Sequence, residues 1–462
     1  MNISSDGLKQ AVKEQGIIQK IARRRFSGTV YLVGGAIREM LLKKTPHDYD
    51  LALTDAKDLG ILENIFKRSS FLLGKKPIQT HRIMTDNTSF DITVIEGTIE
   101  DDLRRRDFTM NAIAYDVRKN TIVDTMGGME DILKMVIRHP SEETIVNDPL
   151  RMLKAIRHLS TLDGFALDDR LLESIRTLKH LIHEVSPERI KYEMDRIIVS
   201  RRVADGMAML EHTGLLFEIF PELYALRLMD IEKNFQLETL GHTLDGFRFL
   251  HHYNNELFLD EKELRNVGYG FLFHDLGKAR TFFYDEKKGT VHFFYHERVS
   301  REIASRIMEK LRFSTQEIKN VLALIENHMR IFLVSDNEPR ERAVRRVVYK
   351  MGDLTPSLVL HTMCDLYGSS GGIDNVSTEQ VKKCCGEILT AYKESLRKPL
   401  PRLINGNDLI SLGFVRGPDI GRCLDDIREK QITGEMTYPG QAFAYARAFL
   451  EDIRKAANGE GT

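Results

Sequence analysis

The sequence lacks the long apolar runs of membrane proteins. No stretch of 18 apolar residues occurs in its 462 residues, and the polar start, Met1 to Gln10, has neither the apolar core of a secretory signal nor a twin-arginine segment. The composition, 42% hydrophobic and 29% charged, is typical of a globular chain. We therefore expect a cytoplasmic protein with no membrane partner.

Cysteine is scarce, and neither sign of charge predominates. The four cysteines lie late in the chain without a CxxC pair, at Cys364, Cys384, Cys385 and Cys423. This pattern excludes a disulfide scaffold, and we expect reduced, structural thiols. Lys and Arg total 67 against 68 Asp and Glu, so any nucleic-acid surface must be local.

The chain is too long for one core, and its length suggests about three domains. Short β-like runs mix with helix-like segments such as Ala36–Lys43 up to about residue 125, whereas after Asp148-Pro149 apolar residues recur at helical spacing. We therefore predict an α+β protein, a small mixed α/β head followed by an all-helical body. The expected strands are Thr29–Val33, Tyr49–Leu53, Phe90–Ile95, Ala112–Val117 and Thr121–Val123, the last two forming a hairpin.

Two aspartates one residue apart, Asp48 and Asp50, are the strongest chemical signal. Side chains alternate along a strand, so these two face the same way, roughly 7 Å apart, while Tyr49, Leu51 and Leu53 face a core. Mg²⁺ is usually held by one or two carboxylates together with substrate phosphates, which favours phosphoryl or nucleotidyl transfer. The alternative is an ordinary Asp-X-Asp at a strand end.

Further motifs follow these aspartates in a set order. A Gly34-Gly35 turn precedes Ala36-Ile37-Arg38, where backbone N–H groups can approach a phosphate. Three longer runs come later: Arg104-Arg105-Arg106-Asp107-Phe108-Thr109-Met110-Asn111-Ala112, Asp124-Thr125-Met126-Gly127-Gly128-Met129-Glu130-Asp131, and Asn147-Asp148-Pro149-Leu150-Arg151-Met152-Leu153-Lys154-Ala155-Ile156-Arg157. In the last run Leu150, Leu153 and Ile156 predict a buried helical stripe, and Asp148 with Pro149 is also what a plain helix N-cap would show.

Together these motifs resemble the class II tRNA nucleotidyltransferase and bacterial poly(A) polymerase family over roughly residues 20–220. The resemblance implies that Asp48 and Asp50 bind catalytic Mg²⁺ in a two-metal mechanism. It implies that Asp148 and Arg151 read the incoming base, that Arg105 and Arg106 bind triphosphate or ribose oxygens, and that Asp107 lies near the sugar. The full expected nucleotide-binding set is Gly34, Gly35, Arg38, Arg105, Arg106, Asp107, Asn111, Asp148, Arg151 and Arg157. Asp91 is either a third carboxylate or a solvated strand residue.

The resemblance predicts a template-independent enzyme that adds C and/or A residues of the CCA terminus to the tRNA 3′ end from CTP and/or ATP. Two departures favour CC addition. Asn147 stands where full CCA-adding members typically have glutamate, and we expect the family's flexible loop to be deleted because Asp91-Ile92-Thr93-Val94-Ile95 runs directly into Glu96-Gly97-Thr98. An A-adding or poly(A) polymerase-type adenylyltransferase is the runner-up.

A second set of residues resembles the HD phosphohydrolase pattern. It comprises His242, His274, Asp275, His296, His328 and Asp365. Imidazoles and carboxylates from several helices can hold one or two divalent ions that activate water, so a second divalent metal is expected here. The alternatives are a vestigial fold, or a phosphohydrolase in which this is the only working site and the head is inert.

The expected domains are the nucleotidyltransferase head at 1–145, a helical nucleotide- and RNA-binding neck at 146–225, an HD-like domain at 226–370 and a tRNA-binding tail at 371–462. Linkers are expected at 368–372 and 399–401, and disorder from about Ala456. Candidate RNA contacts are two basic clusters, at Lys20 to Arg25 and at Arg342 to Arg346, and the tail segments 403–409 and 417–421. Basic clusters of this kind are also ordinary solvated helix faces. A non-enzymatic RNA-binding protein is the remaining alternative.

Overall fold

The computed structural model describes residues 4–73, 79–85, 88–232, 239–336, 340–397 and 401–457. The chain divides into two compact units, Met1–Ile219 and Phe220–Thr462, and each is described by itself. The four domains expected from the sequence divide the chain more finely, and their boundaries stay a prediction. No helix in the described part is apolar over enough residues to cross a bilayer. The expected cytoplasmic location also remains a prediction.

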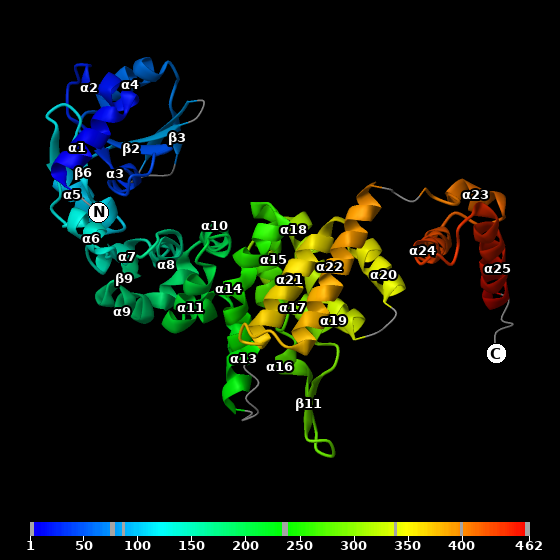
Figure 1. Cartoon of the computed structure of the whole chain (residues 1–462). Coiled ribbons are helices and arrows are strands. Elements are labelled where there is room, and N and C mark those ends of the chain that lie inside the picture. Colours follow the sequence, from blue (N-terminus) through cyan, green and yellow to red (C-terminus); the bar gives the residue numbers. More distant parts are fainter. Residues whose placement is uncertain are drawn as a thin grey trace. The chain divides into compact units, whose positions relative to one another are not determined.

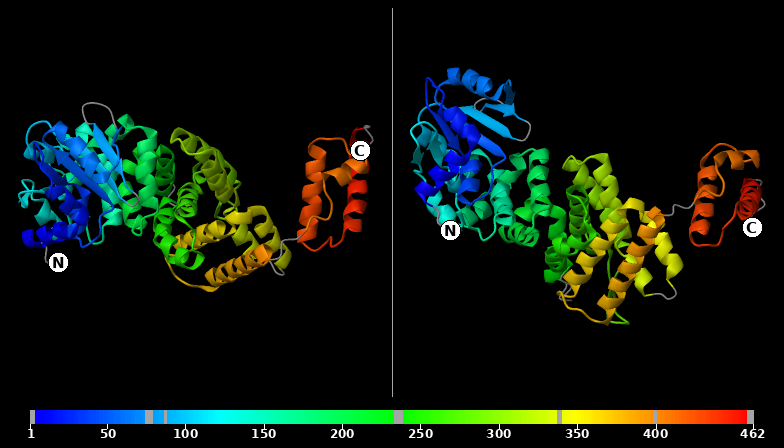
Figure 2. Two further views of the ribbon diagram at one scale, coloured as in Figure 1. Left: turned by 90° about the horizontal axis from the view of Figure 1, so that it is seen from above. Right: turned by 45° about the horizontal axis from the view of Figure 1, so that its top comes forward.

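The first unit is built on a seven-stranded mixed sheet with the order β3-β4-β5-β2-β1-β6-β7. Strands β2 and β5 pair in parallel, and the other neighbours are antiparallel. Figures 1 and 2 show these strands in blue and cyan with the helices of the head around them. The strands are β1 Val30–Val33, β2 Asp48–Leu53, β3 Phe71–Leu73, β4 Thr80–Met84, β5 Ser89–Val94, β6 Ala114–Asp116 and β7 Thr121–Val123.

The expected strands are present, including the β6–β7 hairpin, and the predicted mixed head with a helical body is confirmed. Tyr49, Leu51 and Leu53 are buried as expected. Strands β3 and β4 were not predicted, because three to five residues are too few to show a clear alternation. A core of Val33, Ala52, Ile95, Ile99, Leu103, Ala112 and Ala114 joins the strands to helix α5, Ile99–Arg104.

The helices of the head place its loops. Helix α3, Gly35–Leu41, begins one residue before the predicted segment and ends two residues before its end. The remaining helices of the head are α1 Ser5–Glu14, α2 Gly16–Ala22, α4 Leu59–Phe66 and α6 Gly128–Lys134. A small parallel pair, β8 Val136–Ile137 and β9 Ala166–Leu167, follows. This pair is an exception to the expectation that strands end with the head.

Helices continue the first unit to residue 219. They are α7 Glu143–Asn147, α8 Arg151–Thr161, α9 Asp169–Leu178, α10 Pro187–Ile198, α11 Val203–Thr213 and α12 Leu215–Ile219. The predicted stripe of Leu150, Leu153 and Ile156 is buried. Asp148 is not the N-cap of α8, because Leu150 occupies that position, and the Asp148 carboxylate contacts Arg189 instead.

The described residues of the second unit are helical except for one hairpin. Its helices are α13 Pro221–Glu232, α14 Thr239–Leu257, α15 Glu261–Phe273, α16 Lys278–Thr281, α17 His296–Lys310, α18 Thr315–Asn327, α19 Arg330–Ser335, α20 Glu341–Met351, α21 Thr355–Ser369, α22 Val376–Arg397, α23 Gly406–Ser411, α24 Pro418–Ile432 and α25 Pro439–Ala457. The hairpin, β10 Phe282–Asp285 and β11 Thr290–Phe293, was not expected in an all-helical body.

The remaining features of the fold are the cysteines, the expected linkers and the end of the last helix. The four cysteines are free and buried. The expected linker at 368–372 overlaps the end of α21. Most of the linker at 399–401 lies outside the described residues. Helix α25 extends to Ala457, one residue past the expected onset of disorder, and residues 458–462 are not described.

Candidate active site and metal centre

Three carboxylates lie on neighbouring strands at the centre of the head. Asp48 and Asp50 stand on β2, and Asp91 pairs in register with Asp50 across the parallel β2–β5 ladder. Ser89 donates its hydroxyl to Asp48, and Arg82 donates to both oxygens of Asp91 at 2.6 Å. We call Asp48, Asp50 and Asp91 the carboxylate row. Sequence reasoning missed Arg82 and Ser89 because their contacts join separate strands.

The pKa of Asp50 is raised, first by burial and then by the neighbouring charges of Asp91 and Asp107, while Arg106 and a backbone hydrogen bond from Gly35 oppose the rise. Crowded carboxylates in a desolvated site repel one another, and a divalent cation relieves that repulsion. The donor set, carboxylate oxygens only, is the one Mg²⁺ prefers. The residues therefore fit the expected metal.

The turn between β1 and α3 lies against Asp50. Gly34 has φ +74°, and a Cβ built on it would overlap Oδ2 of Asp50 and come within 3.1 Å of Nη1 of Arg106. Only glycine leaves room for this approach. The Gly34-Gly35 turn therefore helps hold Asp50, a role beyond the phosphate approach expected from the sequence.

A chain of polar side chains joins helix α3 to helix α8. Arg38 donates to Oδ1 of Asn111 at 2.6 Å, and the Asn111 amide donates to Oδ1 of Asp107 at 2.9 Å. Nζ of Lys154 lies 4.0 Å from Oδ2 of Asp107. Burial raises the pKa of Asp107, but Lys154, Asn111 and Arg151 together outweigh burial and bring the pKa below its usual value. The group is therefore ionised. The structure thus brings three of the expected nucleotide-binding residues into one network.

The two consecutive arginines share one buried partner. Nη2 of Arg105 lies 2.7 Å from Oδ1 of Asp102, and Nη2 of Arg106 lies 2.9 Å from Oδ2 of the same carboxylate. Asp102 is 5% exposed. Sequence reasoning missed it, although it precedes the arginines by three and four residues, the spacing at which helical side chains meet.

The residues expected to read the base have partners of their own. Arg151 donates to the backbone carbonyls of Arg105 at 2.8 Å and Arg106 at 3.2 Å. Arg189 donates to the two oxygens of Asp148 at 3.0 and 3.1 Å. Asp148 and Arg151 therefore lie near each other in the chain, but each is held by a different neighbour. Their role in base recognition stays a prediction.

Arg157 forms a buried ion pair. Its Nε lies 2.6 Å from Oε2 of Glu193, and the two side chains are 13% and 4% exposed. The pair joins α8 to α10, and the expected contact of Arg157 with a nucleotide stays a prediction. Glu193 lies within α10, which begins at Pro187.

A second polar cluster lies inside the second unit. We call it the His/Asp cluster, and it contains His242, His274, Asp275, His296, His328 and Asp365. Nε2 of His242 and of His274 each lie 3.1 Å from Oδ2 of Asp275, and Nε2 of His296 lies 3.0 Å from Nε2 of His328. Two sets of three residues are close enough to share an ion, His242 with His274 and Asp365, and His274 with Asp275 and His328. The structure thus brings all six expected residues together.

The geometry of the histidines suits metal binding. Nδ1 of His274, His296 and His328 bonds a backbone carbonyl at 2.6, 3.0 and 2.7 Å, which leaves Nε2 directed at the cluster. Apart from ion pairs such as that with Lys278, Nε2 of His274 and both oxygens of Asp275 are buried without a hydrogen bond of good geometry among the described residues. Such atoms are suited to ligate an ion.

His361 is a seventh member that sequence reasoning missed. Its ring lies 5.3 Å from that of His274, and it is fully buried. It stands four residues before Asp365 on α21, a helical spacing that could have revealed it. Burial lowers the pKa of His361 to about 3 and that of His328 well below its usual value. Burial also lowers the pKa of His274, but Asp275 and Asp365 outweigh it and raise that pKa to about 10.

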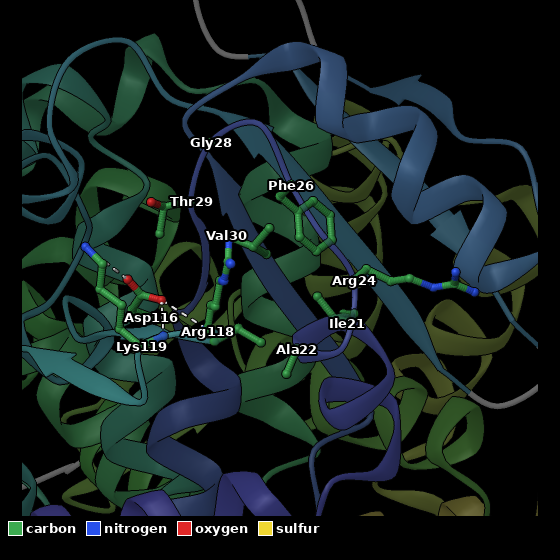
Figure 3. Close-up of a pocket in the computed structure, with 11 residues that line it drawn as sticks. Ile21, Ala22, Arg24, Phe26, Gly28, Thr29, Val30, Asp116, Arg118 and Lys119 are labelled. Atoms are coloured by element: carbon green, nitrogen blue, oxygen red, sulfur yellow. Dashed lines mark hydrogen bonds and ion pairs between the residues drawn. The ribbon is translucent and has the colours of Figure 1, made fainter.

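One cavity of the head lies elsewhere. It has a volume of about 340 Å³ and lies at the start of β1, where Phe26, Val30, Asp116 and Arg118 line it (Figure 3). Arg24 of the first basic cluster also lines it, but none of the residues expected to bind the nucleotide or a metal does. The expected site is therefore defined by its side chains and not by this cavity.

Some residues of the expected basic clusters form ion pairs with acidic side chains. On α20, Arg345 pairs with Glu341 at 2.6 Å and Arg346 with Glu429 of α24 at 2.8 Å. These pairs involve exposed side chains and contribute little stability. Whether α20 contacts RNA stays a prediction, as it does for the basic residues after α2.

Comparison with known proteins relates both sites to characterised families. Residues 30–138 match the model described as the poly A polymerase head domain, residues 164–226 the probable RNA and SrmB-binding site of polymerase A, and residues 239–350 the HD domain. The head match contains Asp48, Asp50 and Asp91, and the HD match contains five members of the His/Asp cluster.

Curated relatives are similar over nearly the whole chain. A CC-adding tRNA nucleotidyltransferase of Thermus thermophilus is 32% identical over 90% of this chain and 92% of its own length. An A-adding tRNA nucleotidyltransferase of Deinococcus radiodurans is 29% identical over 91% and 95%. The fold resembles that of a Thermotoga maritima CCA-adding enzyme solved in complex with tRNA, with a TM-score of 0.59 and 18% identity over 96% of this chain and 94% of that one.

Proposed function

The chain belongs to the class II tRNA nucleotidyltransferase and poly(A) polymerase family, with its head, RNA-binding and HD domains, and from that premise we propose that it adds cytidine residues to tRNA 3′ ends from CTP. The observation that carries this proposal is the carboxylate row with the Gly34 turn against Asp50. Asp48 and Asp50 are the residues that would hold Mg²⁺. The acceptor would be the 3′-hydroxyl of the tRNA.

The residues of the head have separable tasks in this reaction. When bound, Mg²⁺ supplies charge neutralisation for the triphosphate and lowers the pKa of the attacking hydroxyl. Arg105 and Arg106, held by Asp102, present cationic groups suited to phosphate oxygens. Asp107 stays ionised and can accept a hydrogen bond from a ribose hydroxyl. Catalysis of this kind depends mostly on positioning.

Base choice would depend on Asp148 and Arg151. A carboxylate can accept from the exocyclic amine of cytosine or adenine, and a guanidinium can donate to a ring acceptor. To contact the base, the Asp148 carboxylate has to release Arg189 or accept hydrogen bonds from Arg189 and the base at the same time. The contact with Arg189 would keep Asp148 ordered before the nucleotide binds.

Three features favour stopping after two cytidines. Strand β5 ends at Val94 and α5 begins at Ile99, so only residues 95–98 connect them, which leaves no flexible loop at that point. Asn147 replaces the glutamate expected of full CCA-adding members. The Thermus relative is named as CC-adding. The runner-up is an A-adding or poly(A)-type activity, which the name of the Deinococcus relative supports.

The test uses tRNA ending at the discriminator base, after C, and after CC, each with CTP alone or ATP alone and Mg²⁺. We expect CTP to extend the first two substrates to CC and ATP to extend none. Extension of the CC substrate by ATP, with no extension of any substrate by CTP, would replace CC addition by A addition. Failure of every combination with folded protein would reject nucleotide addition.

Substitution of the carboxylates assigns the site. Asp50→Asn should lose activity by at least ~10²-fold, because a neutral amide cannot hold the divalent cation. Glu96→Gln is the matched control, since Glu96 is an exposed acid of the same head that follows β5. Equal activity of both variants would show that Asp50 does not bind the catalytic cation.

A second candidate activity is hydrolysis of a phosphoester at the His/Asp cluster. The observation that favours it is the set of imidazole Nε2 atoms and carboxylate oxygens directed at one another. Asp275→Asn should abolish hydrolysis of a phosphodiester such as bis(p-nitrophenyl) phosphate with Mn²⁺, while Asp48→Asn leaves it intact. No metal-dependent hydrolysis by the wild type would leave the cluster with a structural role.

A further inference from the structure

The β10–β11 hairpin carries an exposed row of aromatic rings. Its strands pair antiparallel, with Phe283 opposite His292, and the turn is closed by Asp285, which accepts from the backbone N–H of Lys287 at 3.0 Å. Figure 1 shows the hairpin extending beyond the helices of its unit. Phe294 lies one residue past the end of β11, and its ring packs against that of His292.

The rings of His292 and Phe294 stack on each other, and the ring of Phe283 lies tilted against both of them. The centroids of His292 and Phe294 lie 5.1 Å apart with 12° between the ring planes, and Phe283 lies 6.4 Å from His292 and 6.3 Å from Phe294. Phe283 is 52% exposed and Phe294 is 59% exposed. Large aromatic side chains are normally covered, so an exposed row marks an interaction surface.

The surroundings of this row favour a nucleic acid over an apolar protein partner. His292, which contacts both phenylalanine rings, is polar and bonds the Thr290 hydroxyl at 3.0 Å. Exposed cations lie at both ends of the hairpin, Lys287 and Lys288 at the turn and Arg298 beyond β11, 5.0 Å from the ring of Tyr295. Flat rings with nearby cations are the features with which proteins bind single strands, because every base has a π-face and every linkage a phosphate.

The root of the hairpin touches the His/Asp cluster. The carbonyl of Phe293 bonds Nδ1 of His296 at 3.0 Å. Nζ of Lys278 lies 2.6 Å from Oδ2 of Asp275 and 5.4 Å from the centroid of the Phe293 ring. If the bases of an RNA strand stack on the hairpin, phosphates of that RNA lie near the His/Asp cluster, whose groups are suited to hold a divalent ion. An apolar protein segment would make no use of this arrangement.

We propose that Phe283, His292 and Phe294 form a stacking surface for single-stranded RNA, separate from the nucleotide-adding site of the head. The proposal does not depend on nucleotide addition, because it concerns a different unit of the chain. We call these three residues the aromatic row.

Tryptophan is absent from the whole sequence, and this makes a direct test possible. Phe294→Trp introduces the only indole and keeps a ring suited to stacking. Titration of the full-length variant with the oligonucleotide U10 should quench its fluorescence, because a base would stack on the indole. Phe258→Trp is the matched control, since Phe258 is 84% exposed in the same unit but is not in the row, and its fluorescence should stay unchanged. Equal quenching of both, or none at position 294, would overturn the proposal.

Affinity gives a second measurement. Removing two stacked rings in Phe283→Ala/Phe294→Ala should weaken binding of fluorescein-labelled U10 about tenfold or more, since each base–ring stack contributes ~1–3 kcal/mol and ~1.4 kcal/mol is tenfold. Addition of CTP to tRNA should stay within about twofold of wild type, which separates this result from a failure of the head. A duplex of the same length should bind the wild type no more tightly than it binds the double variant.

Two outcomes would contradict the RNA surface. Unchanged U10 affinity in the double variant would show that the row does not bind RNA. A wild-type dimer, seen by light scattering, that becomes monomeric in the double variant while U10 affinity stays the same would make the row a contact between copies of the chain. Circular dichroism of each variant establishes that it is folded.

Discussion

Replacing Gly34 by alanine tests how the head holds its carboxylates. Gly34 has φ +74° and ψ −146°, a backbone region nearly confined to glycine, and an L-residue there costs ~1–3 kcal/mol. The new methyl group would also overlap Oδ2 of Asp50 and approach Arg106. Since the turn and the strand are both buried in the sheet, the Asp50 carboxylate is the group that has to move.

The expected loss of activity is larger than the loss of stability. A displacement of about 1 Å in a positioning group costs about 10²-fold in rate, so single-turnover addition of CTP should fall at least ~100-fold. The strain should lower Tm by ~2–12 °C, at ~2–4 °C per kcal/mol for a unit of this size. Nucleotide addition is measured with saturating CTP and Mg²⁺, and Tm by calorimetry.

Gly127→Ala is the matched control. Gly127 has φ +73°, so alanine is strained there too, but its Cβ would meet only Nη2 of Arg138 at 3.5 Å, an ordinary contact. This variant should lose comparable stability and keep its activity within about threefold, because no catalytic group has to move. If Gly34→Ala kept activity within tenfold of wild type, the turn would not position Asp50, and the reasoning would be wrong.

Three further predictions concern stability and metal binding. Glu193→Gln should destabilise the first unit by ~3–5 kcal/mol in urea unfolding, because Arg157 would remain buried without a counter-charge, and a change under ~1 kcal/mol would contradict this. Burial and then Arg157 lower the pKa of His158 far below its usual value, so the imidazole is neutral in the folded state. The free energy of unfolding should therefore fall as pH falls below ~6.5, by up to ~1.4 kcal/mol per pH unit. His158→Gln should reduce that loss between pH 6.5 and 5, and an unchanged pH slope would refute the assignment. Mn²⁺ should raise the Tm of the wild type but not that of His274→Gln. Asp245→Asn, an exposed control on α14, should show the same rise as the wild type. An equal rise in all three proteins would exclude the His/Asp cluster as the metal site.

Local patterns predicted the parts of this protein that depend on neighbours in the sequence. The alternation around Tyr49 and Leu51 predicted that Asp48 and Asp50 leave the core on one side of a strand, because side chains along any strand alternate. The order of the histidines and aspartates predicted that the His/Asp cluster would assemble. Residues close in sequence, or set in a known order, carry this information without a structure.

Contacts between distant segments were decided by the tertiary structure alone. Arg82 reaches Asp91 because β4 and β5 pair in register, and β4 is too short to show a period in the sequence. Asp148 turns to Arg189, 41 residues away, and so does not cap its own helix. A charge–charge contact of this kind depends on how α8 and α10 pack, and packing is set by many buried side chains at once and not by a local pattern.

The aromatic row has the same origin. Phe283, His292 and Phe294 are ordinary residues of a helical region when read along the chain, and they become one surface only when β10 pairs with β11. The sequence by itself therefore determined the five expected strands of the head, the helical character of most of the body, the chemical types at the two sites and the family resemblance. Only the tertiary structure determined which charges pair, that the His361 ring packs against His274 and which rings stay exposed, because these depend on register and packing between segments far apart in the chain.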